Sequence, residues 1–226
     1  MTWSAVIFDL DGTILDSAPI ICAAMAQATT EFGHPRKPEV FRPYIGPPPW
    51  HTFAEVTGES EEFVERLVPH YRAIYDAMMA ETPAFEGVPE VIRTLAAAGI
   101  PMAVATSKLR SAAISLLELH GLADVFVTIQ GAGADAGSAD KARVIGTALD
   151  DLRAAGVDVT EPVMIGDRSH DVHGAARFGI PTILVAWGYA QPGEEADALT
   201  VAETPADLAD LLTSESATQA APNRLR

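Results

Sequence analysis

Short runs of consecutive apolar residues recur along the chain and predict the strands of a buried sheet. Near-continuous apolar runs are typical of strands that are covered on both faces. The expected strands are Ala5–Phe8, Met102–Ala105, Val125–Ile129, Val163–Ile165 and Thr182–Val185. Helical patterns lie between the later runs and end at Gly99, Gly121 and Gly179. Because strands alternate with helices, the pattern predicts a doubly wound parallel α/β sheet with helices on both faces.

One segment departs from this alternation, because it contains helical patterns without a strand pattern. Ser17 is placed to cap its first helix, and a later helix opens near Ser60. Pro69 within the later helix predicts a kink or a break, and we expect the stretch YIGPPPWHTF between the helices to form a turn. The pattern therefore predicts an α/β core of residues 1–16 and 84–212, a small helical cap of residues 17–83 and a disordered tail of residues 213–226.

The charge of the chain limits its expected partners, and its cysteine content bears on the compartment. The chain has 15 Lys and Arg against 31 Asp and Glu, which gives a net charge of −16. A surface of this charge repels polyanions, so neither nucleic acid nor a membrane is an expected partner, and a phosphate site would depend on local cations. Cys22 is the only cysteine, which fits a reducing compartment. With no leader pattern and no long apolar segment, we expect a cytoplasmic protein.

Two aspartates, Asp9 and Asp11, directly follow the first predicted strand. Like charges this close repel each other, and burial raises the cost of each charge. Either one carboxyl group is protonated, or a cation lies between the two. The pair therefore points to chemistry at the end of this strand.

Further polar residues occupy equivalent positions at the ends of two other predicted strands. Thr106, Ser107 and Lys108 follow one of them, and Asp167 follows another. In open parallel sheets, ligands bind in the crevice at the carboxyl ends of the strands. We therefore expect these residues to converge on the aspartate pair, with Lys141 reaching in from the start of a helix.

The oxygen ligands Asp9, Asp11 and Asp167 favour a hard cation, and Mg²⁺ suits few protein ligands together with water and phosphate. A hydroxyl group, a lysine and a metal around one carboxylate match the needs of phosphoryl transfer. Asp9 would attack phosphorus and form an aspartyl-phosphate. Asp11 would protonate the leaving oxygen and then take a proton from the hydrolytic water.

The motifs DLDGTILDS, ATS, Lys141 and GDRSHD, in this order, closely resemble the four motifs of the haloacid dehalogenase-like superfamily of phosphohydrolases. The resemblance extends from about Trp3 to Leu212, and the helical insert matches the cap of that family. The stretches IGPPPW and GDRSHDVHGA look like the branch that contains phosphoglycolate phosphatases and 5′-nucleotidases.

The resemblance implies a role for each motif residue. Asp9 would be the nucleophile and Asp11 the acid/base, and Thr106 and Lys141 would contact phosphate. Magnesium would lie on Asp9, the main-chain carbonyl of Asp11 and Asp167. Asp171 would be a further ligand or a partner that orients Lys141. We also expect substrate contacts from Ser107, Lys108 and, in the cap, Gly46.

The sequence thus predicts a Mg²⁺-dependent phosphatase that acts on a small phosphomonoester through an aspartyl-phosphate. A sugar phosphomutase that returns the phosphoryl group to its substrate is the alternative. A receiver-like phospho-acceptor without enzymatic activity is disfavoured, because no insert would follow its first strand. The sequence predicts neither the identity of the ester nor the oligomeric state.

Overall fold

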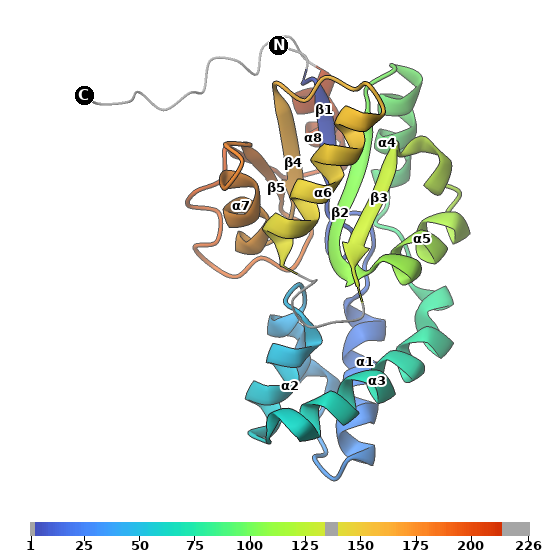
Figure 1. Cartoon of the computed structure of the whole chain (residues 1–226), viewed down its shortest axis with the longest axis vertical. Helices are drawn as coiled ribbons and strands as arrows, with labels where there is room; N and C mark the ends of the chain where they lie inside the picture. The colour runs from blue at the N-terminus through green and yellow to red at the C-terminus, as the bar shows by residue number, and fades with distance from the viewer. Residues whose placement is uncertain (1–2, 134–139, 214–226) are drawn as a thin grey trace, which may run out of the picture.

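A six-stranded sheet forms the centre of the molecule, in which every pair of neighbouring strands is parallel (Figure 1). The computed structural model describes residues 3–133 and 140–213. The strands, in the order β3-β2-β1-β4-β5-β6, are β1 (Ala5–Phe8), β2 (Met102–Leu109), β3 (Thr128–Ala132), β4 (Pro162–Gly166), β5 (Thr182–Val185) and β6 (Thr200–Ala202). The predicted α/β class is confirmed.

Helices cover both faces of the sheet. One face packs against α4 (Val88–Ala97), α5 (Arg110–Leu119) and α8 (Pro205–Thr213), and the other against α6 (Lys141–Ala154) and α7 (Ser169–Ala176). In β1, Val6 and Phe8 face the first group, whereas Ala5 and Ile7 face the second. All four side chains are fully buried, which explains why the strand is apolar at every position.

The cap packs around a hydrophobic cluster of its own, at the edge of the sheet toward which the strands run (Figure 1). It contains α1 (Ala18–Glu31), α2 (Pro49–Thr57), α3 (Glu61–Met78) and two 3₁₀ helices, Pro38–Tyr44 and Met79–Glu81. No strand occurs in residues 17–83, as predicted. Within the described ranges, no helix is both long enough and apolar enough to cross a bilayer.

The two chain segments that lead into and out of the cap run side by side. The amide of Asp16 donates to the carbonyl of Pro83 at 2.9 Å, and Leu15 forms an antiparallel bridge with Ala84. This pairing places the start of α1 beside the segment that leaves the cap. The cap therefore stands over the carboxyl ends of the central strands.

Several predicted elements differ from the structure. The third strand begins at Thr128 rather than Val125, because Ala123–Val125 form a short 3₁₀ turn. Pro69 does not break α3, which is continuous through it. The second half of YIGPPPWHTF is helical, since Pro49 opens α2, where a missing amide costs nothing.

The chain end also departs from the prediction. The three-residue strand β6 was not predicted, and Thr213, which was assigned to the tail, is the last residue of α8. The rest of the predicted tail, residues 214–226, lies outside the described residues.

Candidate active site

The polar residues that follow the central strands converge at one edge of the sheet, as the topology predicts. Asp9 follows β1, Thr106 lies near the end of β2 and Asp167 follows β4, and these three strands are neighbours. We call this region, together with Lys141 and Asp171, the catalytic edge. All five side chains are buried, so their charges must be balanced locally.

Lys141 is the cation at the centre of the catalytic edge. It is the first residue of α6, whose N-cap Asp140 accepts a hydrogen bond from the amide of Arg143 at 2.9 Å. The Lys141 Nζ atom lies 2.7 Å from Asp9 Oδ1 and 2.8 Å from Asp171 Oδ1, and it donates to the carbonyl of Ala105 at 2.9 Å. Burial acts to lower the pKa of Lys141, but the carboxylates of Asp171 and Asp9 raise it above its usual value. The ammonium group is therefore held charged.

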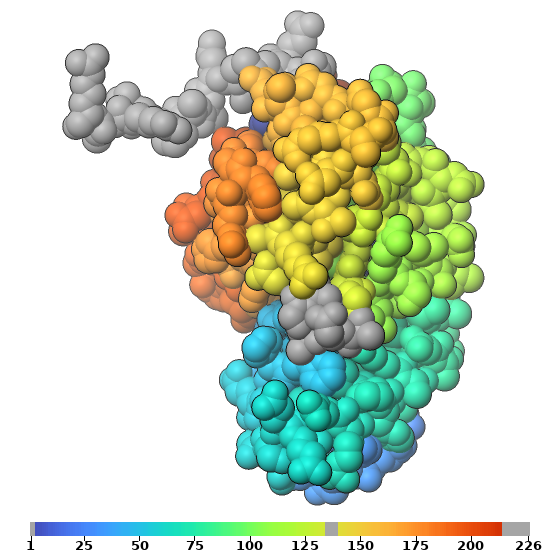
Figure 2. All heavy atoms as spheres, viewed as in Figure 1, coloured from blue at the N-terminus to red at the C-terminus, as the bar shows by residue number. Residues whose placement is uncertain are grey.

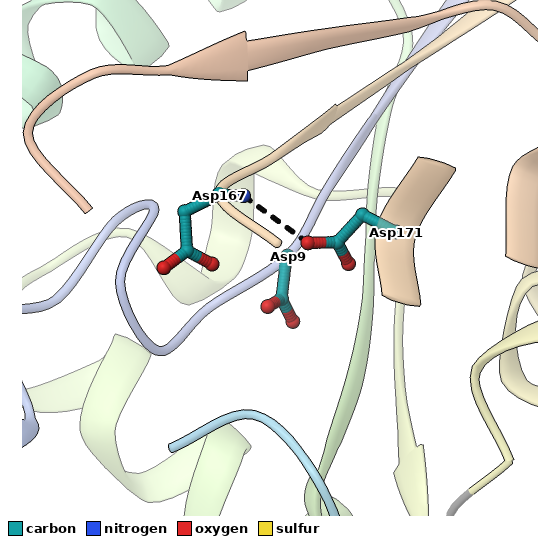
Figure 3. A group of neighbouring side chains, drawn as sticks. All are labelled: Asp9, Asp167 and Asp171. Carbon is teal, nitrogen blue, oxygen red and sulfur yellow. Dashed lines mark hydrogen bonds between the residues drawn. The ribbon is translucent and has the colours of Figure 1, made fainter. Parts of the chain in front are cut away.

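Asp9, Asp167 and Asp171 form a crowded group of carboxylates (Figure 3). One oxygen from each lies within 4.8 Å of the others. Burial raises the pKa of Asp9 to about 6, against the opposing effect of Lys141. Burial and the charges of Asp171 and Asp9 raise the pKa of Asp167 well above its usual value. The group carries more negative charge than Lys141 alone can balance.

The oxygens of Asp167 suggest where a cation would fit. Oδ2 accepts a hydrogen bond from the amide of Tyr189 at 2.7 Å, whereas the buried Oδ1 has no hydrogen-bond partner among the described residues. Backbone also crowds this carboxylate, because a Cβ atom on Gly12, where φ is +89°, would lie 2.1 Å from Asp167 Oδ2. An unpaired buried carboxylate oxygen facing other carboxylates fits a divalent metal ion with oxygen ligands.

Both oxygens of Asp171 are already bound within the protein. Oδ2 accepts from the amides of Asp167 and Arg168, each at 3.1 Å, and Oδ1 pairs with Lys141 (Figure 3 shows the bond from Asp167). Of the two predicted roles for Asp171, these contacts favour that of orienting Lys141 and the loop after β4.

Asp11 has a separate set of partners. Lys108 Nζ lies 2.9 Å from Asp11 Oδ2 and 3.0 Å from Oδ1, and the hydroxyl of Ser17 donates to Oδ1. The same ammonium group lies 4.4 Å from the centre of the Tyr75 ring in α3. Ser17 occupies the N-cap position of α1, but its side chain makes no capping bond, so the expected capping role is wrong.

A cavity lies between the catalytic edge and the cap, and we call it the cap–core cavity. Its volume is about 80 Å³. Three predicted substrate contacts, Ser107, Lys108 and Gly46, line it together with Asp11, whereas Thr106 is buried and its hydroxyl accepts from the amide of Lys108 at 3.2 Å. Further lining residues from the cap include Ile21, Met25, Tyr44, Ile45, Tyr71 and Tyr75. In the space-filling view, the surfaces of cap and core meet directly (Figure 2).

Sequence reasoning did not single out Tyr189, which follows β5. Its hydroxyl donates to Asp16 Oδ1 and accepts from the amide of Ala18, both at 2.9 Å, while its own amide binds Asp167. Tyr189 thus connects the start of the cap to the catalytic edge. No local pattern could predict the bonds to Asp16 and Ala18, because these residues lie more than 170 positions away along the chain.

The chain is similar to known proteins in both sequence and fold. The family model described as "Haloacid dehalogenase-like hydrolase" matches residues 6–185. A 5′-nucleotidase of Pseudomonas aeruginosa is 32% identical over 192 residues, which cover 84% of this chain and 85% of that protein. The crystal structure of a predicted phosphatase from Clostridium acetobutylicum superimposes with a TM-score of 0.85 at 28% identity, covering 93% of this chain and 98% of that one.

A third relative has a different name. The tyrosine-protein kinase PtkA of Mycobacterium tuberculosis is 40% identical over 185 residues, which cover 81% of this chain. The matched region is 62% of PtkA, so the chain spans about three fifths of the length of that relative. The family match covers most of the sheet and the cap, and it includes every residue of the catalytic edge. As the motifs predicted, the chain belongs to the haloacid dehalogenase-like hydrolase family.

Proposed function

We propose that this protein is a Mg²⁺-dependent phosphatase that hydrolyses a small phosphomonoester through an aspartyl-phosphate on Asp9. The observation that carries the proposal is the position of the Asp9 carboxylate, which lies 2.7 Å from a buried ammonium group at the carboxyl edge of a parallel sheet. A carboxylate held beside a fixed cation is suited to attack an anionic phosphoryl group, because the cation reduces their mutual repulsion.

The metal site proposed for Mg²⁺ consists of Asp9, Asp167 and the main-chain carbonyl of Asp11. The partnerless Oδ1 of Asp167 and the crowding of the carboxylates support this assignment. When bound, Mg²⁺ would supply positive charge to the phosphoryl oxygens as negative charge develops on them.

In the first step, an Asp9 oxygen forms a bond to phosphorus as the bond from phosphorus to the leaving oxygen breaks. Asp11, which must be in its protonated form for this step, gives its proton to that oxygen, so the product leaves as an alcohol. Lys141 holds Asp9 in place, and the hydroxyl of Thr106 would contact a phosphoryl oxygen, as the family resemblance implies. In the second step, Asp11 takes a proton from water as water attacks phosphorus, which releases inorganic phosphate and restores the Asp9 carboxylate.

The cap–core cavity supports a small leaving group. It opens on Asp11, the proposed proton donor, and its volume is about 80 Å³, whereas a second pocket of about 500 Å³, lined by Ser107 and Lys141, lies at the same edge. Lys108 and Arg72 lie in its wall and are the cations available to an anionic group on the substrate. We therefore expect the part of the substrate that lies beside Asp11 to be small.

Phosphorylation of protein tyrosine is the second candidate function. The observation that favours it is the 40% identity to PtkA, which exceeds the 32% identity to the 5′-nucleotidase. A kinase would need to accept a nucleoside triphosphate and a tyrosine side chain at this edge, where a second pocket, lined by Lys141 and Ser107, has a volume of about 500 Å³.

Release of inorganic phosphate from a panel of esters tests both functions. The panel contains glycolate, nucleotide, sugar and pyridoxal phosphates and phosphotyrosine, each with and without Mg²⁺. We expect Mg²⁺-dependent release that is lost in Asp9→Asn and kept in Asp150→Asn, a control at an aspartate whose side chain is exposed. Transfer of label from ATP to tyrosine without ester hydrolysis would instead indicate the kinase. Isomerisation of a sugar phosphate without free phosphate would indicate the mutase.

A further inference from the structure

Arg168 follows Asp167 directly, and its guanidinium group contacts Glu194 in the core and two carbonyls of the cap. The residue is 5% exposed, which is unusual for arginine, so its guanidinium group must be bound on several sides. One side is taken by Glu194, in the segment between β5 and β6. Nε lies 2.7 Å from Glu194 Oε2, and Nη2 lies 3.1 Å from Oε1, which makes a bidentate pair.

The other side of the guanidinium group reaches the cap. Nη1 donates to the carbonyl of Pro43 at 3.3 Å and also to the carbonyl of Ile45. These carbonyls belong to residues 43–46, which we call the cap strap, and a Cβ atom on Gly46 would lie 3.5 Å from Arg168 Cγ. The side chain of one core residue thus binds two carbonyls of this short cap segment.

Glu194 is itself fixed to the core. It accepts hydrogen bonds from the hydroxyl of Ser169 at 3.0 Å and from the amide of Gln191 at 3.2 Å. Contacts within the core therefore fix the orientation of the Arg168 guanidinium group, independently of the cap. Lysine could not replace it, because a single ammonium group cannot present separate edges to a carboxylate and to two carbonyls.

The cap strap forms part of the wall of the cap–core cavity. Tyr44, Ile45 and Gly46 all line that cavity, together with Lys108 and Asp11. If the strap moved away from the core, the cavity would lose this wall, and a leaving group would lose the contacts that the wall provides.

We propose that Arg168, held by Glu194, is a positioning residue that fastens the cap strap to the catalytic edge and so forms the binding site for the leaving group. This inference rests on the proposed function for its kinetic consequence, but the fastening itself is a property of the free protein. Arg168 does not contact the reacting atoms in this role. It acts through the carbonyls of Pro43 and Ile45.

Hydrogen–deuterium exchange, read by mass spectrometry on the peptide that covers residues 40–46, tests the fastening without any substrate. The variants are Arg168→Lys and Glu194→Gln, and the control is Arg153→Met, which removes an exposed ion pair far from the cap, with Asp150. We expect exchange in this peptide to become about tenfold faster in Arg168→Lys, to rise less in Glu194→Gln, and to stay unchanged in the control.

Steady-state kinetics test the consequence with whichever ester is hydrolysed best. We expect KM to rise at least fivefold in Arg168→Lys while kcat changes less than twofold, because the strap binds the leaving group and takes no part in proton transfer. The Mg²⁺ concentration that gives half-maximal activity should stay the same, since the metal ligands are untouched.

Three results would overturn the inference. Unchanged exchange at residues 40–46 in a folded Arg168→Lys variant would show that the strap does not depend on this contact. Faster exchange spread evenly over the chain would reveal a purely structural role. A shift in Mg²⁺ dependence with KM unchanged would place Arg168 with the metal ligands instead. If no ester is hydrolysed at all, the proposed function fails, but the exchange result still decides whether the strap is fastened.

Discussion

At the scale of single residues, the arrangement of charge decides what the catalytic edge can do. Lys141 is the shared partner of Asp9 and Asp171, so one ammonium group fixes both the proposed nucleophile and the loop after β4. The motif order predicted that Lys141 would be near the aspartates. It did not predict that Asp11 would instead pair with Lys108, which lies within β2 and reaches Asp11 across 97 residues of sequence.

Replacing Lys141 by methionine should remove this shared partner while keeping the length of the side chain. We expect kcat/KM for the best phosphate ester to fall at least a hundredfold, since Asp9 would lose its fixed cation. The free energy of unfolding should also fall, by about 3 kcal/mol, because two buried carboxylates are left unpaired. Urea unfolding and initial rates measure the two effects. Lys37→Met, at an exposed position in the cap, is the control and should change neither.

Cys22 offers a separate test of cap packing. Burial raises the pKa of this thiol to about 11, so only about one molecule in ten thousand carries a thiolate at pH 7. We expect a disulfide reagent such as DTNB to modify the folded protein at least a hundredfold more slowly than the urea-unfolded protein. Modification at equal rates would show that the interior of the cap is open to solvent.

At the scale of elements, apolar strands were predictable and the contacts between distant loops were not. The runs that form β1, β4 and β5 are buried on both faces, so sequence alone marks them. By contrast, β6 has three residues and its neighbours give no periodic signal. The bonds of Tyr189 to Asp16 and Ala18 join segments far apart in the sequence, where only the folded topology brings the partners together.

Tyr189→Phe should weaken the connection between the core and the start of α1. The change removes the hydroxyl that bonds to Asp16 Oδ1 and to the amide of Ala18, and it leaves the ring in place beside Phe85. We expect the free energy of unfolding to drop by about 1–2 kcal/mol, because a buried amide loses its acceptor. Urea denaturation measures this. Tyr44→Phe, which removes an exposed hydroxyl bonded to Glu55, should cost less than half as much.

At the scale of the whole molecule, stability and the proposed function place opposite demands on the catalytic edge. A fully apolar edge would be easier to bury, but this one holds Asp9, Asp167 and Asp171 together with Lys141 as their neighbouring cation. The cap covers these charges, which strengthens their interactions and raises the cost of leaving them unbalanced. A divalent cation would relieve that cost. Metal binding should therefore stabilise the fold as well as support catalysis.

We accordingly expect Mg²⁺ to raise the midpoint of thermal unfolding, and to do so more at pH 7.5 than at pH 5. The pKa of Asp9 is raised to about 6, so without metal the protonated carboxyl favours the fold at low pH, and that stabilisation is lost as the pH rises from about 4 through 6. Mg²⁺ takes the place of the lost protons only above this range. At a hundred times its dissociation constant, Mg²⁺ should contribute about 2.7 kcal/mol to the free energy of unfolding.

Calorimetry with and without Mg²⁺ measures the shift in the unfolding midpoint. Asp167→Asn should abolish this shift, while Asp150→Asn should keep it. An equal shift at both pH values would mean that Mg²⁺ acts elsewhere than on these carboxylates.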